Sequence, residues 1–154
     1  MSANDYNKMK ALVQEVLHNA DNSSDPSIKS NLAVLACILT SGMIEAAARH
    51  FLSLYAHRRS SPTVHQFVVS KLRRSTNNLK TEDLLVLVGS FDPELRKKIE
   101  SKLDDEAKDS IDSVVDRRNK LAHGNVSGIG LDTMKRYFAS ISLAMDMVGA
   151  ELSL

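Results

Sequence analysis

Each of the three prolines in this chain directly follows a residue that commonly caps helices, in the pairs Asp25-Pro26, Ser61-Pro62 and Asp92-Pro93. Proline suits the first turn of a helix because its missing N–H would be unpaired there, and the preceding side-chain oxygen accepts a hydrogen bond from that turn. Each pair therefore predicts a helix start. Because β-branched residues never alternate with polar residues over the length of a strand, the chain predicts an all-α protein.

Apolar residues with helical spacing fill most of the remaining sequence. The expected helices cover about residues 5–19, 27–57, 62–74, 82–89, 93–103, 105–122 and 133–152. With 154 residues, of which 43% are apolar, and no internal repeat, the chain is long enough for one real core. We therefore expect a single domain over residues 1–154, built as an up-and-down helical bundle.

Composition narrows the partners and the compartment. A formal net charge of +1 gives no whole-molecule field that would attract nucleic acid or membrane, so such a partner needs a local patch. The only cysteine, Cys37, lies in the apolar run LAVLACIL, which excludes an intrachain disulfide and favours a reducing cytoplasm. The start MSANDYNKMK lacks a secretory pattern, and polar residues interrupt the apolar run 32–48. We therefore expect a buried helix, a cytoplasmic protein and no membrane partner.

Charge is unevenly distributed along the chain. No acid lies between Glu45 and Glu82, whereas seven Lys and Arg residues do, and we call residues 46–81 the basic interval. A near-neutral protein needs basic residues somewhere, and a solvated face is their commonest use. The alternative is a nucleic-acid surface on the second and third expected helices, and both interpretations stay open. The candidate RNA-binding residues are Arg58, Arg59, Lys71, Arg73 and Arg74.

The stretch DRRNKLAHGN, residues 116–125, places charged groups at the end of the expected helix 105–122. At about 100° per residue, Arg118 falls within an apolar stripe on this helix. The stripe consists of Ala107, Ile111, Val114, Val115, Leu121 and Ala122. A guanidinium facing a core needs an acidic partner or an open cleft, and Glu45 is a lone acid in the second helix. We expect the two to pair, either as part of a site or as an internal ion pair alone.

Asn119 and His123 lie one turn apart on one flank, and Gly124 follows where a left-handed residue often ends a helix. Alone, His123 is a helix-end residue whose cation the helix dipole favours. Together with Arg118 for phosphate charge and Asn119 to orient it, His123 has the chemistry to cleave RNA, because the ribose 2′-hydroxyl is an internal nucleophile. One histidine does not easily serve as both base and acid, so a symmetric dimer is expected.

The residues RRNKLAHG resemble the signature of the HEPN superfamily. In that signature four to six residues separate an arginine from a histidine, and the first of them is polar. Arg118, Asn119 and His123 fit with four intervening residues. Arg117 would give five, but the stripe position favours Arg118, and we expect Arg117 and Lys120 to face solvent. A long apolar helix with one acid, followed by a helix ending in this motif, is similar to RiboL-PSP-type and related stand-alone HEPN proteins.

The resemblance implies a homodimeric all-α endoribonuclease that needs no metal or other cofactor, with the motif near the two-fold axis. It makes Arg118 and His123 catalytic and Asn119 and Glu45 supporting. It also implies a role in toxin–antitoxin or antiviral defence systems, with an antitoxin or regulatory protein as a possible partner. The alternative is a HEPN-like module without catalysis that binds RNA, a nucleotide or a protein through the same cleft.

Two other signals were given simpler interpretations. The segment GNVSGIG, residues 124–130, lacks the Gly-Lys-Ser/Thr ending of a phosphate loop and follows a helix, so we expect a connection beside the cleft. His18, His50, His57 and His65 show no metal-ligand spacing with Cys37 or with acids, so no metal site is expected. His50 is expected at the edge of the core.

Overall fold

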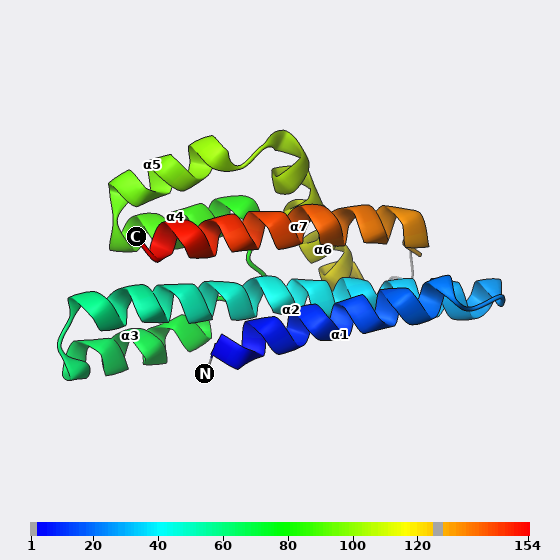
Figure 1. Ribbon diagram of the computed structural model, residues 1–154, viewed down its shortest axis with the longest axis horizontal. Coiled ribbons are helices and arrows are strands. Elements are labelled where there is room, and N and C mark those ends of the chain that lie inside the picture. Colours follow the sequence, from blue (N-terminus) through cyan, green and yellow to red (C-terminus); the bar gives the residue numbers. More distant parts are fainter. Residues whose placement is uncertain (1–2, 125–127) are drawn as a thin grey trace.

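The computed structural model describes residues 3–124 and 128–154, and within them the chain forms seven α-helices and no strand (Figure 1). The all-α prediction is confirmed, and the expected helix bounds agree with the observed ones to within a few residues. The helices are α1 (Ala3–Asp21), α2 (Pro26–Arg59), α3 (Pro62–Ser75), α4 (Thr81–Phe91), α5 (Pro93–Lys102), α6 (Asp105–Ala122) and α7 (Leu131–Leu152).

The three proline pairs begin helices as predicted. The Asp25 side chain accepts a hydrogen bond from the Ser27 N–H at 2.8 Å, and the Ser61 hydroxyl accepts one from Val64 at 3.3 Å. The Asp92 side chain accepts from the N–H groups of Glu94 and Leu95 at the start of α5. Each cap satisfies N–H groups that have no partner inside the helix.

The 34-residue helix α2 runs the length of the molecule and contacts α1, α3, α6 and α7. Figure 1 shows α1 and α3 running antiparallel to α2 on one side of it and α7 on the other side, with α5 above α7 and α4 overlapping the C-terminal part of α7 in this view. By length and composition α2 could cross a membrane, but more than half of its most apolar stretch is buried inside the bundle. This burial agrees with the expected core helix.

The core is aliphatic, and the motif helix α6 contributes Ala107, Ile111, Val114 and Val115 to it as expected. Beyond Val115 the apolar stripe was predicted to continue through Leu121 and Ala122. Leu121 is instead half-buried and Ala122 is exposed, because the last turns of α6 extend past the packed core. The motif residues therefore lie on the part of α6 that leaves the core.

Candidate active site

The motif lies on the C-terminal turns of α6, and local chemistry fixes both ends of this helix. At the start, the Asp104 side chain accepts a hydrogen bond from the Ala107 N–H at 2.7 Å. At the end, the His123 N–H donates to the Asn119 carbonyl at 3.2 Å, and Gly124 follows with a φ of 76°. The left-handed glycine at the end of the helix is as predicted. His123 is therefore the C-cap residue of α6.

Arg118 is held by an asparagine instead of an acid. Its Nη1 donates to Asn78 Oδ1 at 2.6 Å and lies 3.5 Å from Asn119 Oδ1. Glu45 Oε1 accepts from the backbone N–H of the same Asn78 at 2.9 Å, and Glu45 Oε2 lies 4.0 Å from Arg49 Nη1. The expected direct pair of Glu45 and Arg118 is therefore not formed, because Asn78 lies between them and contacts both.

Asn78 was missed in the sequence analysis. It lies in the connection between α3 and α4, and its φ of 56° makes it the only non-glycine residue with a positive φ in the described part of the chain. Asparagine tolerates this left-handed conformation better than most residues. The pair Asn77-Asn78 between two helices was the available signal for such a turn, although nothing in it indicated contact with Arg118.

The connection containing Asn78 is anchored on both sides. Arg49 Nη1 donates to the buried Thr76 hydroxyl at 2.9 Å, which fixes the connection to α2. The Thr81 N–H at the start of α4 donates to Asp112 Oδ1 at 2.8 Å, which fixes it to α6. Asn78 is thus positioned between α2 and α6 by contacts on either side of it.

The acid nearest the motif on α6 is Asp116, which is paired with cations. Lys120 Nζ lies 2.9 Å from Asp116 Oδ2 and Lys80 Nζ lies 3.9 Å from its Oδ1. The hydrogen bond from Lys120 is the main reason that the pKa of Asp116 lies below its ordinary value. Asp116 is therefore an anion at neutral pH and does not serve as a proton donor there.

His123 is exposed, and its ring forms no hydrogen bond with another described residue. The amide of Asn119, which was expected to orient this ring, faces Arg118 instead.

Arg117 was expected to face solvent, but it is half-buried and its Nη1 donates to the Gly128 carbonyl at 3.1 Å. Lys120 is exposed as expected. Residues 125–127 of the segment GNVSGIG lie outside the described residues, so its expected place beside the cleft stays a prediction.

The basic interval divides into two groups. Arg58 and Arg59 lie at the end of α2, where they donate to the carbonyls of Ser153 and Leu154. Arg59 lies fourteen positions after Glu45 on this helix, which is roughly 20 Å at 1.5 Å per residue. Arg73 and Arg74 lie in the last turn of α3, just before the connection that holds Arg118.

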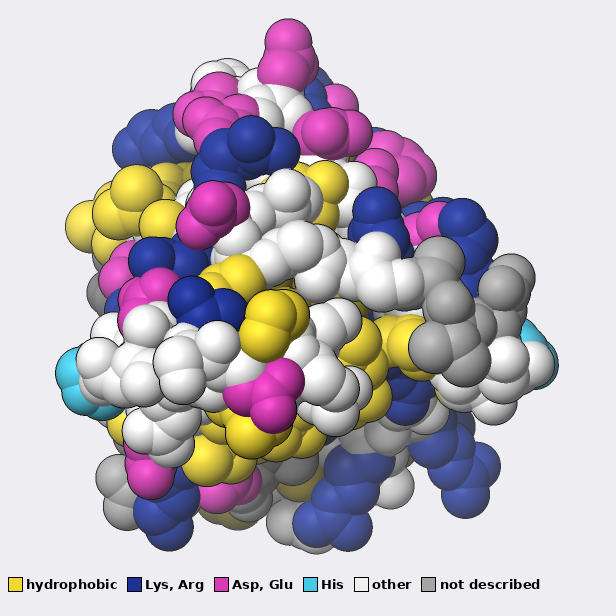
Figure 2. All heavy atoms as spheres, turned by 90° about the vertical axis from the view of Figure 1, so that its right-hand side faces the viewer, with side chains coloured by type: hydrophobic (Ala, Val, Ile, Leu, Met, Phe, Trp, Pro, Cys, Tyr) yellow, Lys and Arg dark blue, Asp and Glu magenta, His cyan; other side chains and the backbone are white. Residues whose placement is uncertain are grey.

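Lys71 is also exposed on α3, with its Nζ over the Phe67 ring at 5.4 Å from the centroid. Figure 2 views the end of the molecule at the right of Figure 1. Several acidic side chains lie toward the top of this view and Lys and Arg side chains project at the lower edge, although side chains of the opposite charge occur in both places. Of the predicted RNA-binding residues, Arg73 and Arg74 are those that precede the connection whose Asn78 contacts Arg118.

The other histidines are apart from the motif. His50 is 8% exposed, and burial lowers its pKa, as expected for a residue at the edge of the core. The rings of His57 and His65 are 4.9 Å apart between α2 and α3. Among the described residues, no group of three or more His, Cys, Asp or Glu side chains is placed to hold a metal ion.

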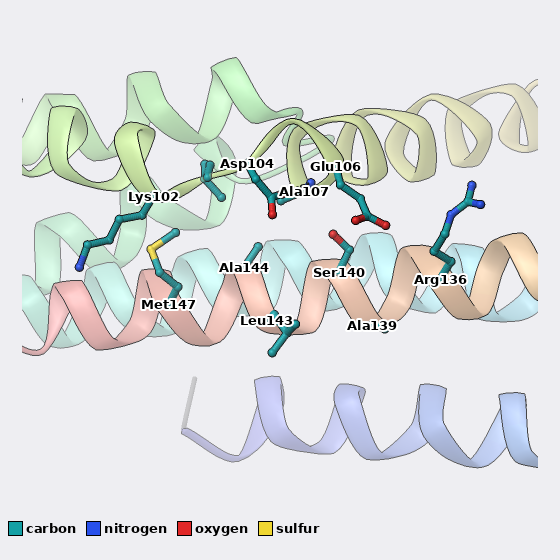
Figure 3. Close-up of a pocket in the computed structure, with 11 residues that line it drawn as sticks. Lys102, Asp104, Glu106, Ala107, Arg136, Ala139, Ser140, Leu143, Ala144 and Met147 are labelled. Carbon is teal, nitrogen blue, oxygen red and sulfur yellow. Dashed lines mark hydrogen bonds between the residues drawn. The ribbon is translucent and has the colours of Figure 1, made fainter.

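A cleft of about 340 Å³ lies on a different face, between α7 and the junction of α5 and α6. Figure 3 shows Lys102 and Arg136 at opposite ends of it, with Leu143 and Met147 on α7 between them. None of the predicted site residues lines this cleft. Its floor is mainly apolar, unlike the surroundings of Arg118.

Comparison with known proteins agrees with the fold. Neither the curated proteins nor the solved structures gave a match to this chain. A family model does match. The model described as RiboL-PSP-HEPN covers residues 4–149, which include Glu45, Asn78 and the whole motif from Arg118 to His123, and the chain therefore belongs to this HEPN family.

Proposed function

We propose that this protein is a metal-independent endoribonuclease that cleaves RNA by attack of a ribose 2′-hydroxyl on the adjacent phosphate. Membership of a HEPN family indicates an RNA-related module. The observation that carries the finer proposal is the placement of Arg118 and His123 on the last turns of one helix. The guanidinium is fixed by Asn78, whereas the imidazole is exposed to solvent, where an RNA strand could reach it.

Arg118 is suited to stabilise the phosphorane. A guanidinium has five N–H donors, and the contacts to Asn78 and Asn119 use only Nη1. The remaining donors are available to phosphate oxygens, and a preorganised cation stabilises the developing charge without reorganisation. In this proposal Asn119 and Glu45 are supporting residues. Asn119 contacts Arg118 directly, whereas Glu45 acts through the Asn78 backbone.

The reaction needs a base and an acid. One imidazole takes the 2′-hydroxyl proton while the O2′–P bond forms, and a protonated imidazole donates to the 5′-oxygen as the P–O5′ bond breaks. The products are a 2′,3′-cyclic phosphate and a free 5′-hydroxyl. Since one protomer offers a single exposed His123, we propose a homodimer whose two-fold axis brings two copies of the motif together.

The proposed setting is a toxin–antitoxin or antiviral defence system in the cytoplasm, in which an antitoxin or regulatory protein covers the motif. An exposed catalytic histidine on an RNA-cleaving enzyme gives such a partner a direct means of control. It would block the strand by covering the end of α6. No membrane partner is proposed.

The test is cleavage of a mixed RNA in EDTA, with the ends of the products identified. We expect cyclic phosphate ends, and a loss of at least about 100-fold in rate for His123→Ala and for Arg118→Ala. The matched control is Lys120→Ala, which removes an exposed cation from the same turns and should cleave at close to the wild-type rate. Intact RNA after prolonged incubation, or equal cleavage by His123→Ala, would contradict the proposal.

One observation favours a second candidate, a HEPN module that binds RNA without cleaving it. Asn119 contacts Arg118 and leaves the His123 ring with no orienting partner among the described residues. This candidate predicts that wild-type protein binds RNA and leaves it uncut. In that case Arg118→Ala would weaken binding, and His123→Ala would have no activity to remove.

A further inference from the structure

A polar cavity of about 290 Å³ lies between α2 and α3, separate from the motif. Its polar lining consists of Arg49, Ser53, His65, Gln66 and Arg73. We propose that this cavity binds a phosphoryl group of RNA at a subsite away from the bond that is cleaved. The inference rests on the proposed function, because it takes RNA as the ligand.

The lining is matched to an anion. It combines two guanidinium groups with an imidazole, a hydroxyl and an amide, and no acid lines it. Both helices contribute residues from the basic interval. The nearest acid to Arg49 along α2 is Glu45, whose Oε2 lies 4.0 Å from Arg49 Nη1, and it does not line the cavity. A phosphate seated between two arginines can accept several charge-assisted hydrogen bonds. Within a cavity these bonds are less weakened by water than on an open surface.

The two arginines differ in how they are held. The Arg49 side chain is 19% exposed, and its Nη1 donates to Thr76 Oγ1 at 2.9 Å, which fixes the guanidinium at the wall of the cavity. Arg73 is exposed on α3 and reaches the cavity from its rim. A fixed inner cation and an exposed outer one allow an anion to enter and then to be held from both sides. The fixed arginine loses little freedom when the anion binds.

Ser53 and His65 provide further donors. Ser53 Oγ and His65 Nε2 are 3.1 Å apart, and the hydroxyl and the ring come from α2 and α3. A serine hydrogen-bonded to a histidine also suggests a nucleophile and its base. Such a pair needs a third group to orient the ring, and among the described residues no acid is hydrogen-bonded to His65. The pair is therefore better suited to hold a phosphate than to attack an acyl group.

A series of side-chain and backbone contacts links the cavity to the motif. Arg49 lines the cavity and lies beside Glu45, Glu45 accepts from the Asn78 N–H, and Asn78 holds Arg118. A strand held at the cavity would therefore pass along the end of α3 to reach Arg118. This geometry makes Arg73 and Arg49 the guides for RNA in place of Arg58 and Arg59, which lie at the far end of α2.

Two sources of phosphate fit this chemistry, an internal phosphodiester and a terminal phosphate monoester. The experiment uses a short single-stranded RNA with 2′-O-methyl riboses, which cannot be cleaved by 2′-hydroxyl attack. It is labelled at the 3′ end and prepared with either a 5′-hydroxyl or a 5′-phosphate. Affinity is measured by fluorescence anisotropy over a series of salt concentrations, and circular dichroism confirms the fold of each variant.

We expect Arg73→Gln to weaken binding about tenfold and to reduce the salt slope by about 0.7, the value for one phosphate contact on a single strand. The matched control, Arg136→Gln, removes the same charge from an exposed position on α7 outside the cavity and should weaken binding no more than about twofold. Ser53→Asp, which adds an acid to the cavity, should weaken binding at least as much as Arg73→Gln. An effect confined to the 5′-phosphorylated probe identifies a terminal phosphate, and an equal effect on both probes identifies an internal one.

The proposal is overturned if the two arginine variants behave alike, if Ser53→Asp binds like wild type, or if neither probe binds. Because the probe cannot be cleaved, this outcome is separate from the test of catalysis. A protein that leaves ordinary RNA intact but loses probe binding through Arg73→Gln retains the subsite and lacks the activity. A protein that cleaves RNA but binds the probe equally well as Arg73→Gln has the activity and lacks the subsite.

Discussion

Asn78 joins two charged side chains that were expected to meet directly. Its backbone N–H donates to Glu45 and its side-chain oxygen accepts from Arg118, so a neutral residue separates an acid from a guanidinium. A direct ion pair would use more of the Arg118 donors and would offset its charge. Contact with a neutral amide leaves the charge of Arg118 available to a phosphate.

Replacing Asn78 by glycine tests this role. Asn78→Gly keeps the left-handed backbone and its N–H, and it removes the side-chain amide whose oxygen holds Arg118. If Arg118 acts in cleavage, we expect a fall of about tenfold in rate, corresponding to about 1.4 kcal/mol of transition-state stabilisation. The melting temperature should change little, because Asn78 is exposed. Rates are measured on RNA in EDTA.

The neighbouring Asn77→Gly is the control, since Asn77 is also exposed in the same connection. It makes the same chemical change and should retain the wild-type rate. Asn78→Ala adds backbone strain and should lower both the rate and the melting temperature. If Asn78→Gly cleaves as fast as wild type while Arg118→Ala does not, then Arg118 does not depend on Asn78.

The residue-level predictions succeeded where the cause was local. The helix end at His123 and Gly124 follows from neighbouring residues, and so does the burial of His50 on an apolar helix. The Arg118 partner was missed because Asn78 is 40 residues away in the sequence. Periodicity identifies the face on which Arg118 lies, but it does not identify which connection packs against that face.

At the level of helices, the starts were predictable because each capping residue adjoins the helix that it begins. The packing distance between helices was harder to predict from the sequence, and the contact of α2 with α7 shows why. A Cβ atom added at Gly149 would lie 2.4 Å from Phe51 Cζ. The Phe51 ring also packs against Tyr6, with 5.4 Å between the ring centroids. The sequence shows a glycine in α7 but not the ring that requires it.

Gly149→Ala should therefore destabilise the fold. The added methyl group meets a ring that is itself packed, and overpacking of this kind costs about 1–3 kcal/mol, partly offset by the higher helix propensity of alanine. Gly42→Ala is the matched control, because the nearest atom to its added Cβ is the terminal methyl of Met9, which can move away. We expect urea unfolding to show a loss for Gly149→Ala and none for Gly42→Ala. Equal midpoints would contradict this account of the contact.

A second contact between helices should depend on pH. Glu151 on α7 is buried and is held by Lys102 and Lys98 of α5, with Lys98 Nζ 3.0 Å from its Oε2. The hydrogen bond from Lys102, followed by that from Lys98, lowers the pKa of Glu151. Because the unfolded chain then binds more protons, this contribution to stability is present above about pH 4.3 and is lost as the pH falls further.

Glu151→Gln should therefore lower the melting temperature at pH 7, and the difference from wild type should shrink as the pH falls toward about 3. Thermal unfolding followed by circular dichroism at several pH values measures this. Glu94→Gln is the control, because Glu94 is exposed and its salt bridge in the described part of the chain is to Lys97 on its own helix. If the difference in melting temperature stays constant across the pH range, the charge of Glu151 does not stabilise the contact between α7 and α5.

At the level of the whole molecule, the helix order and the all-α class followed from periodicity and caps. The arrangement around Arg118 did not, because it depends on the connection between α3 and α4 entering the space between α2 and α6. The division of the basic interval has the same origin. Arg59 and Arg73 are close in sequence, but the turn from α2 into α3 directs Arg73 back toward the motif.

A dimer formed around the motif is the remaining requirement of the proposed mechanism, and His123→Cys tests it. Burial raises the pKa of Cys37 to about 11, so the native thiol should not react at neutral pH and the new cysteine should be the only reactive one. If two copies of the motif meet, a short bis-maleimide should give a covalent dimer in high yield at low protein concentration. Thr63→Cys, at the exposed start of α3, should give little dimer under the same conditions. Equal yields from the two variants would place the motif away from any two-fold axis and would leave a single His123 to act as both base and acid.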